Sequence, residues 1–149
     1  MKTGVANVLA SCAVIAVLFL TGCGLRKVAV AGIPPEVESV VGTVSEDIAQ
    51  ENYDKVYTES SALWKNEVTA QQSAETLKSL HSKLGKVESR AVHTAAEQEN
   101  SGGPLKGHSF IVVYQTKFER GEAMETFTLV EENGKWKLAR YLVNSTSLR

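Results

Sequence analysis

Four residues whose side chains could do chemistry together lie in the C-terminal part of the chain: Tyr114, Thr116, Glu125 and Arg140. A guanidinium recognises an anionic group of a ligand through paired hydrogen bonds, and a neighbouring carboxylate can orient that ligand. The four residues therefore predict the polar floor of a ligand pocket. An arginine that faces its own carboxylate is already neutralised, so they also fit a salt bridge that fixes the register of a sheet, or a sheet end that opens to solvent.

Glu125 beside Tyr114 also fits the chemistry of a small isomerase or hydrolase. A carboxylate base next to hydroxyl donors in a dry cavity can move a proton near neutral pH. Other reaction centres have no counterpart, because the sequence contains no P-loop, no G-x-G-x-x-G and no G-x-S-x-G segment. We therefore expect no cofactor.

Metal and nucleic-acid binding have little support in the sequence. His81, His93 and His108 lack the H-x-x-x-H or paired-carboxylate spacing of metal sites, so we expect no metal. The formal net charge is -1, and Lys135 and Lys137 alternate with acidic residues, so we expect no nucleic-acid partner. Both cysteines lie within the first 23 residues, which leaves no disulfide framework for the rest of the chain.

Three amphipathic helices are predicted ahead of these polar residues. Apolar side chains recur at helical spacing over residues 37–48 and again over 53–64. A third apolar stripe over 74–84 follows Thr69 and Gln72, which form a capping-box pattern, and it stops at Gly85. After Gly85 the period of the pattern changes from 3.6 to 2.

Four strands are predicted in this second half, over residues 86–97, 108–119, 122–131 and 135–145. Asn133-Gly134 is a strong signal for a two-residue hairpin, and Arg120-Gly121 is a weaker one. With 43% apolar residues, the chain can form one domain. We predict an α+β fold in which three N-terminal helices pack on one face of a curved four-stranded antiparallel sheet.

The two hairpins also predict the register of the sheet. They place Arg140 opposite Phe127 and Glu125 opposite Thr116, with Arg140 and Glu125 diagonal neighbours on the face that the helices cover. The same face receives the apolar residues Phe110, Val112, Tyr114, Phe118, Phe127, Leu129, Trp136, Leu138 and Leu142. The opposite face, which includes Thr128 and Tyr141, is mixed and could meet water.

The order of elements, with Phe127-Thr128-Leu129-Val130 and the closing run from Gly134 to Tyr141, resembles the nuclear transport factor two-like and cystatin-like superfamily. More narrowly, the sequence resembles small uncharacterised bacterial lipoproteins of that type. The resemblance covers residues 36–145 and implies a cone of helices and sheet. Such a cone holds an enzyme site, a ligand pocket or only a packed core, so the fold does not decide the function.

The N-terminus has the layout of a signal peptide over residues 1–22, with Lys2 ahead of an apolar run. Leu20-Thr21-Gly22-Cys23 resembles the lipobox of bacterial lipoproteins, which implies diacylglycerol on the Cys23 thiol and bound palmitate. The alternatives are cleavage after Ala29-Val30-Ala31, which would release a soluble protein, and an uncleaved membrane span. Residues 23–35 then form the lipidated cysteine and a tether, and residues 36–149 form the domain.

We therefore expect a non-enzymatic, lipid-anchored protein of the bacterial cell envelope. It would meet the membrane through Cys23, and in a diderm host it would sit on the outer membrane facing the periplasm, because Gly24 is not an aspartate. Its domain would bind a small ligand or an envelope protein. The alternative remains a small isomerase or hydrolase that uses Glu125.

Overall fold

The computed structural model describes residues 32–149. Its elements are α1 (Pro35–Ala49), α2 (Tyr53–Glu59), α3 (Ala62–Glu67), α4 (Ala70–Leu84), β1 (Val87–Asn100), β2 (Gly107–Phe118), β3 (Gly121–Glu132), β4 (Lys135–Asn144) and a final 3-10 turn, η1 (Thr146–Leu148). The predicted signal peptide, Cys12, Cys23 and most of the tether lie outside these residues. Within 32–149, no helix is both long and apolar enough to cross a membrane.

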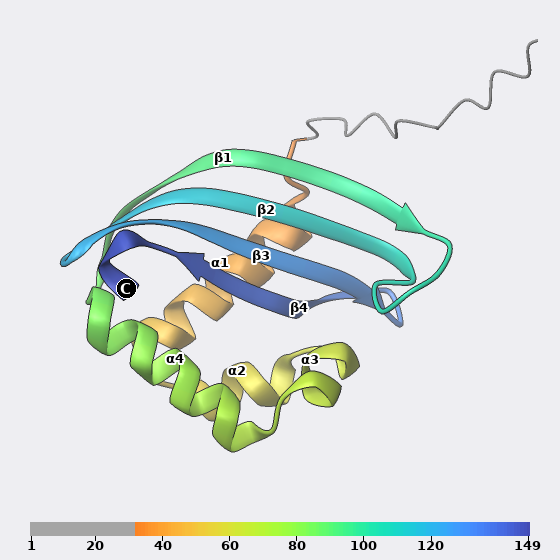
Figure 1. Cartoon of the computed structure of the whole chain (residues 1–149). Helices are drawn as coiled ribbons and strands as arrows, with labels where there is room; N and C mark the ends of the chain where they lie inside the picture. The colour runs from red at the N-terminus through yellow and green to blue at the C-terminus, as the bar shows by residue number, and fades with distance from the viewer. Residues whose placement is uncertain (1–31) are drawn as a thin grey trace, which may run out of the picture.

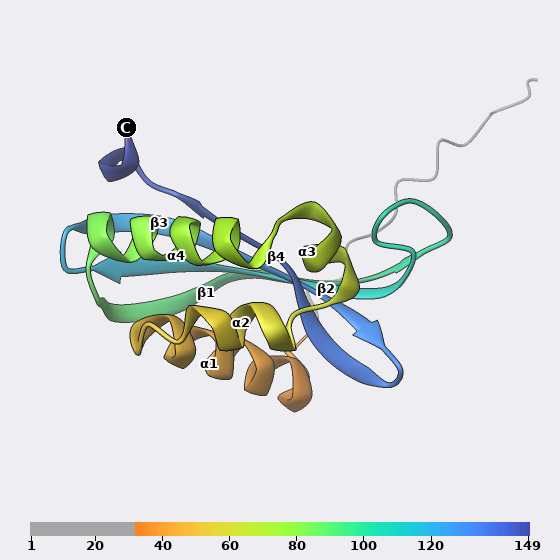
Figure 2. The same cartoon turned by 90° about the horizontal axis from the view of Figure 1, so that it is seen from below.

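The predicted fold class is confirmed. The four strands form one antiparallel sheet in the order β1-β2-β3-β4. The sheet curves along its strands, and the helices lie on one side of it (Figure 1). Seen from the helix side, α2 runs between α1 and α4, and α3 lies beside β4 (Figure 2).

Helices α1 and α4 form where the apolar stripes predict them. Val37, Val41 and Val44 of α1 are buried against the sheet. At the start of α4, the Thr69 side chain accepts from the Gln72 backbone N–H while the Gln72 side chain accepts from the Thr69 backbone N–H, so the predicted capping box is present. Gly85 ends this helix with a φ of 77°, a conformation that favours glycine.

The second predicted helix is two helices rather than one, so the structure has four in place of the expected three. Ser60 and Ser61 are extended and interrupt the helical path between α2 and α3. The Ser61 backbone N–H donates to the Leu138 carbonyl at 2.9 Å, and its side chain caps α3 by accepting from the Trp64 backbone N–H. The helix breaks here because Ser61 is extended and docks on β4.

The β2–β3 turn differs from the prediction by one residue. Glu119 and Arg120 form the turn, so Phe118 pairs with Gly121 and Tyr114 pairs with Glu125. The predicted pairing of Thr116 with Glu125 is therefore wrong. A register shift of two residues keeps every side chain on its predicted face, because side chains alternate with a period of two.

The β3–β4 hairpin starts in the predicted register and then changes. Asn133 and Gly134 have positive φ values of 54° and 73°, and Glu132 pairs with Lys135. A β-bulge follows at Ala139, which has no partner between the pairs Leu129–Leu138 and Thr128–Arg140. Beyond it, every residue of β4 faces the side opposite to the predicted one.

Candidate functional site

A fully buried carboxylate, that of Glu125, lies on the helix-covered face of the sheet. Each of the four strands contributes one side chain to it. Arg90 of β1, Thr116 of β2 and Tyr141 of β4 all donate hydrogen bonds to Glu125 of β3. Together with Ser45 of α1, which accepts from Arg90, these residues form what we call the Glu125 cluster.

Arg90 and Glu125 form a bidentate ion pair. The Nε–Oε2 distance is 2.7 Å and the Nη2–Oε1 distance is 3.0 Å. The Arg90 side chain is 19% exposed, and its guanidinium lies 5.5 Å from the centre of the Tyr114 ring. Nη1 donates to Ser45 Oγ at 3.0 Å. The paired geometry and the aromatic contact fix the guanidinium against the sheet.

Two hydroxyls complete the hydrogen bonding of Glu125. Tyr141 donates to Oε1 at 2.5 Å and Thr116 donates to Oε2. Burial raises the pKa of Tyr141 well above its ordinary value, and the neighbouring Glu125 charge raises it further. Tyr141 therefore remains a neutral phenol that donates to the carboxylate.

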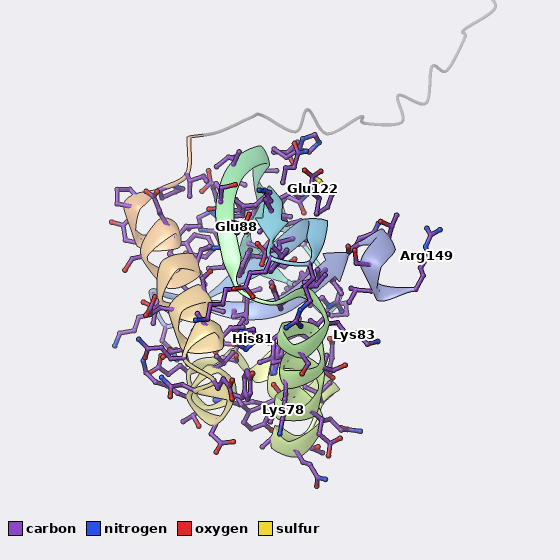
Figure 3. All side chains as sticks on the ribbon, turned by 90° about the vertical axis from the view of Figure 1, so that its left-hand side faces the viewer. Lys78, His81, Lys83, Glu88, Glu122 and Arg149 are labelled. Atoms are coloured by element: carbon purple, nitrogen blue, oxygen red, sulfur yellow. The ribbon has the colours of Figure 1, made fainter. Side chains whose placement is uncertain are left out.

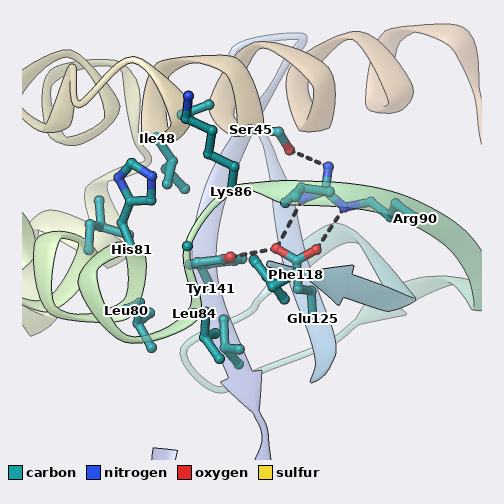
Figure 4. Close-up of a pocket in the computed structure, with 15 residues that line it drawn as sticks. Ser45, Ile48, Leu80, His81, Leu84, Lys86, Arg90, Phe118, Glu125 and Tyr141 are labelled. Carbon is teal, nitrogen blue, oxygen red and sulfur yellow. Dashed lines mark hydrogen bonds and ion pairs between the residues drawn. The ribbon is translucent and has the colours of Figure 1, made fainter. Parts of the chain in front are cut away.

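The Glu125 cluster forms the polar end of a narrow cavity between α1, α4 and the sheet (Figure 4). About 40 Å³ of it is open to the centre of a water-sized molecule. The cavity is lined mainly by apolar side chains, chief among them Ile48, Leu77, Leu80, Leu84, Phe118 and Val143. It therefore combines apolar walls with a small, fixed polar end, which is typical of a ligand site.

His81 of α4 lies on the side of that helix that faces α1 (Figure 3), and it also lines this cavity. Its Nδ1 is 3.3 Å from the Tyr53 hydroxyl and 3.9 Å from a Glu51 carboxylate oxygen. Lys86 is exposed beside it and also lines the cavity. The cavity therefore has a polar rim as well as a polar floor.

The structure brings only part of the predicted pocket together. Thr116 and Glu125 are in direct contact, and Tyr114 lies on the same face under the Arg90 guanidinium. The pKa of Tyr114 is raised, because the effect of burial outweighs the opposing effect of the Arg90 charge. Arg140 is not in the pocket, because the bulge at Ala139 removes it from the helix-covered face.

Arg140 instead pairs with Glu67 of α3, with an Nη2–Oε1 distance of 2.5 Å. This hydrogen bond lowers the pKa of Glu67 and raises that of Arg140. Both side chains are well exposed. The predicted pairing of Glu125 with Arg140 is therefore wrong, and Glu125 pairs with Arg90 instead.

Sequence reasoning missed Arg90, Tyr141 and Ser45. The sequence predicts Tyr141 on the opposite face, because the Asn133-Gly134 signal carries no information about a bulge five residues after Gly134. Arg90 belongs to β1, which a long loop separates from β2, so no turn signal sets its register. The β1–β2 ladder also contains bulges at Glu88 and His93.

A second polar group occupies the far end of the same face. The two ring nitrogens of His108 contact Glu131 at 2.8 Å and Glu97 at 2.5 Å, and its ring lies 4.7 Å from that of Trp136. The hydrogen bond to Glu131, with that to Glu97, raises the pKa of His108. Since the two nitrogens of one ring point apart, this group cannot close on one ion, and residues 32–149 contain no group of histidine, cysteine and acidic residues suited to a metal.

A wider groove runs between α1, α2 and β4, and about 400 Å³ of it is open to the centre of a water-sized molecule. Its buried acid, Asp47, is held by Lys55 at 2.9 Å. Trp136 and Leu138 line its β4 side. Lys55 is 49% exposed, whereas Arg90 is 19% exposed, so the ion pair of this groove is closer to solvent than the one in the smaller cavity.

A family model described as "Protein of unknown function (DUF4019)" matches residues 43–141. The chain belongs to the DUF4019 family. The DUF4019 match begins within α1 and ends at Tyr141, so it contains every residue of the Glu125 cluster. No curated protein matches the chain at a significant level.

Proposed function

We propose that this DUF4019 protein is a non-enzymatic, lipid-anchored protein of the bacterial cell envelope whose domain binds a small ligand in the cavity above the Glu125 cluster. The observation that carries the proposal is the buried Arg90–Glu125 pair at the end of an apolar cavity. A packed core alone would fill this space with apolar side chains, because burying an ion pair is seldom more stabilising than burying apolar groups of the same volume.

The alternative, an isomerase or hydrolase that uses Glu125 as its base, has less support. An ionised carboxylate has about four lone-pair positions. Two N–H groups of Arg90 and the hydroxyls of Thr116 and Tyr141 already fill them. A general base needs a free position within hydrogen-bond reach of its substrate, and Glu125 has none left.

The lipid anchor rests on the sequence of the N-terminus. Leu20-Thr21-Gly22-Cys23 is the lipobox pattern, and Gly24 favours the outer membrane in a diderm host. The likeness to cystatin-like lipoproteins supports the same location. The α+β architecture agrees with that likeness, with helices covering one face of a curved sheet.

Ligand binding is tested by thermal unfolding of the full chain in detergent, followed by tryptophan emission, with and without the small-molecule fraction of a bacterial envelope. A ligand at 100 times its Kd adds about 2.7 kcal/mol, which raises the Tm by several degrees. Leu80→Trp should abolish the rise, because Leu80 lines the cavity. Glu75→Trp adds the same ring to the exposed side of α4 and should keep it. An absent rise, or equal rises in both variants, contradicts the proposal.

Lipidation is tested by growing cells with an alkyne analogue of palmitate and measuring the intact mass of the protein. The parent chain should take up the label, and Cys23→Ser should lose it. Cys12→Ser is the matched control and should remain labelled, because Cys12 lies within the predicted signal peptide. Labelling that survives Cys23→Ser would contradict the anchor.

A further inference from the structure

The hydrogen-bonding groups at the floor of the cavity are unevenly used. Glu125 has no acceptor position left, as counted above. Arg90 carries five N–H groups, of which three have partners among residues 32–149. One N–H remains on each terminal nitrogen. Arg90 can therefore donate further hydrogen bonds to a ligand, whereas the acceptor positions of the Glu125 carboxylate are all filled.

The position of the guanidinium makes these donors available to a ligand. Arg90 lines the cavity together with Tyr141 and Leu84. Figure 4 shows the end of the Arg90 group between Ser45 and Glu125, directed toward the side where Tyr141 and Leu84 lie. An oxygen atom entering the cavity would therefore meet the remaining N–H groups.

The charge of the floor selects against ions. Arg90 and Glu125 neutralise each other, and the carboxylate is fully buried. A ligand carboxylate on Arg90 would lie close to a like charge, and a ligand ammonium would meet the guanidinium. Either ion would also lose its hydration without gaining a free partner of opposite charge.

The walls and the size of the cavity restrict the rest of the ligand. Only about 40 Å³ of the cavity is open to the centre of a water-sized molecule, so the space beside the floor admits a small molecule or one end of a larger one. Leu77, Leu80 and Leu84 of α4 line one wall of the cavity. An apolar chain can lie along these leucines behind the group that reaches Arg90.

We propose that the cavity takes a small uncharged molecule with a hydrogen-bond-accepting oxygen, such as the carbonyl of a ketone, amide or ester, carried on a short apolar chain. This inference rests on the proposed function and specifies the ligand class of the same site. The oxygen accepts from Arg90, and the chain displaces water from the leucines. The exposed Lys86 at the rim would favour an anion, and the test below distinguishes a neutral ligand from an anionic one.

The test compares probes of similar size by ligand-detected NMR titration of the full chain: 2-pentanone, hexane, pentylammonium and pentanoate. We expect 2-pentanone to bind at least tenfold more tightly than the other three. Arg90→Lys keeps the positive charge beside Glu125 but removes the planar set of guanidinium N–H donors. It should raise the Kd for 2-pentanone at least tenfold and leave the Kd for hexane unchanged. Arg140→Lys makes the same change at the Glu67 pair and should have no effect.

Each other outcome overturns the inference in a recognisable way. Equal binding of hexane would mean that the floor plays no part in recognition. Tighter binding of pentanoate would assign recognition to Lys86 at the rim. If the envelope fraction raises the Tm and 2-pentanone does not bind, the ligand class is wrong while the proposed function stands. If neither binds, both are wrong.

Discussion

Removing the charge of Glu125 should destabilise the fold strongly. Glu125→Gln keeps the size of the side chain but leaves the Arg90 guanidinium without its counter-charge. Breaking a buried ion pair by removing one partner costs about 3–5 kcal/mol. Because the Arg90 side chain is 19% exposed, water can solvate part of its charge, and we expect the lower end, about 3 kcal/mol.

Urea denaturation followed by the emission of Trp64 and Trp136 measures this loss. In thermal unfolding, a loss of about 3 kcal/mol would lower the Tm of a domain of this size by about 12 °C. Glu67→Gln is the matched control, because it breaks the exposed Arg140 pair in the same chemical way. An exposed pair contributes about 0–1 kcal/mol, so this variant should unfold close to the parent.

A double variant separates the ion pair from the general packing of the site. Adding Arg90→Met to Glu125→Gln removes the unpaired charge. The free energy of unfolding should then rise by at least 1 kcal/mol relative to Glu125→Gln alone. If Glu125→Gln unfolds within 1 kcal/mol of the parent, or if the double variant is less stable than either single one, the buried pair does not hold the floor as described.

Three further predictions concern stability. Gly85→Ala should lower the free energy of unfolding by about 1–3 kcal/mol, because a side chain is strained at a φ of 77° and its Cβ would collide with the Glu119 side chain. Thr69→Ala should cost about 1 kcal/mol by removing the cap of α4. Glu131 and Glu97 raise the pKa of His108, so the folded state binds its proton more tightly than the unfolded state. The stabilisation is therefore complete below about pH 6.5, and it is lost as the pH rises through the raised pKa of His108 in the folded state. NMR titration of the His108 ring measures this pKa, and denaturation at several pH values measures the stability.

Each of these has a control. Gly102→Ala places its Cβ in open space and should leave stability unchanged. Thr58→Ala removes a hydroxyl that donates only to a helix carbonyl, and it should cost less than Thr69→Ala. In His108→Gln the rise in stability toward acid pH should be reduced; an unchanged pH profile would contradict the assignment to His108.

Local signals predicted the parts of the fold that local interactions decide. The capping box at Thr69, the stop at Gly85 and the Asn133-Gly134 turn each satisfy backbone groups within a few residues, so the sequence window contains the whole interaction. Glu125 also stood out, because a charged residue interrupts the apolar alternation of its strand.

The partners of Glu125 could not be predicted, because they depend on distant contacts. The bulge at Ala139 lies where Ser61 docks on the neighbouring Leu138 carbonyl, far away in the sequence. One extra residue there exchanges the faces of Arg140 and Tyr141. Two bulges and a long loop likewise hide the register that brings Arg90 to Glu125.

The central claim is that a small ligand reaches the Arg90 floor of the cavity. NMR of the arginine side chains of the full chain, with the envelope small-molecule fraction added, tests this directly. The account predicts that the Nη resonances of Arg90 shift, while its Nε–H, held by Glu125, and the resonances of Arg140 move little. Arg90 resonances that stay unchanged while the fraction raises the Tm would place the ligand elsewhere and contradict the account.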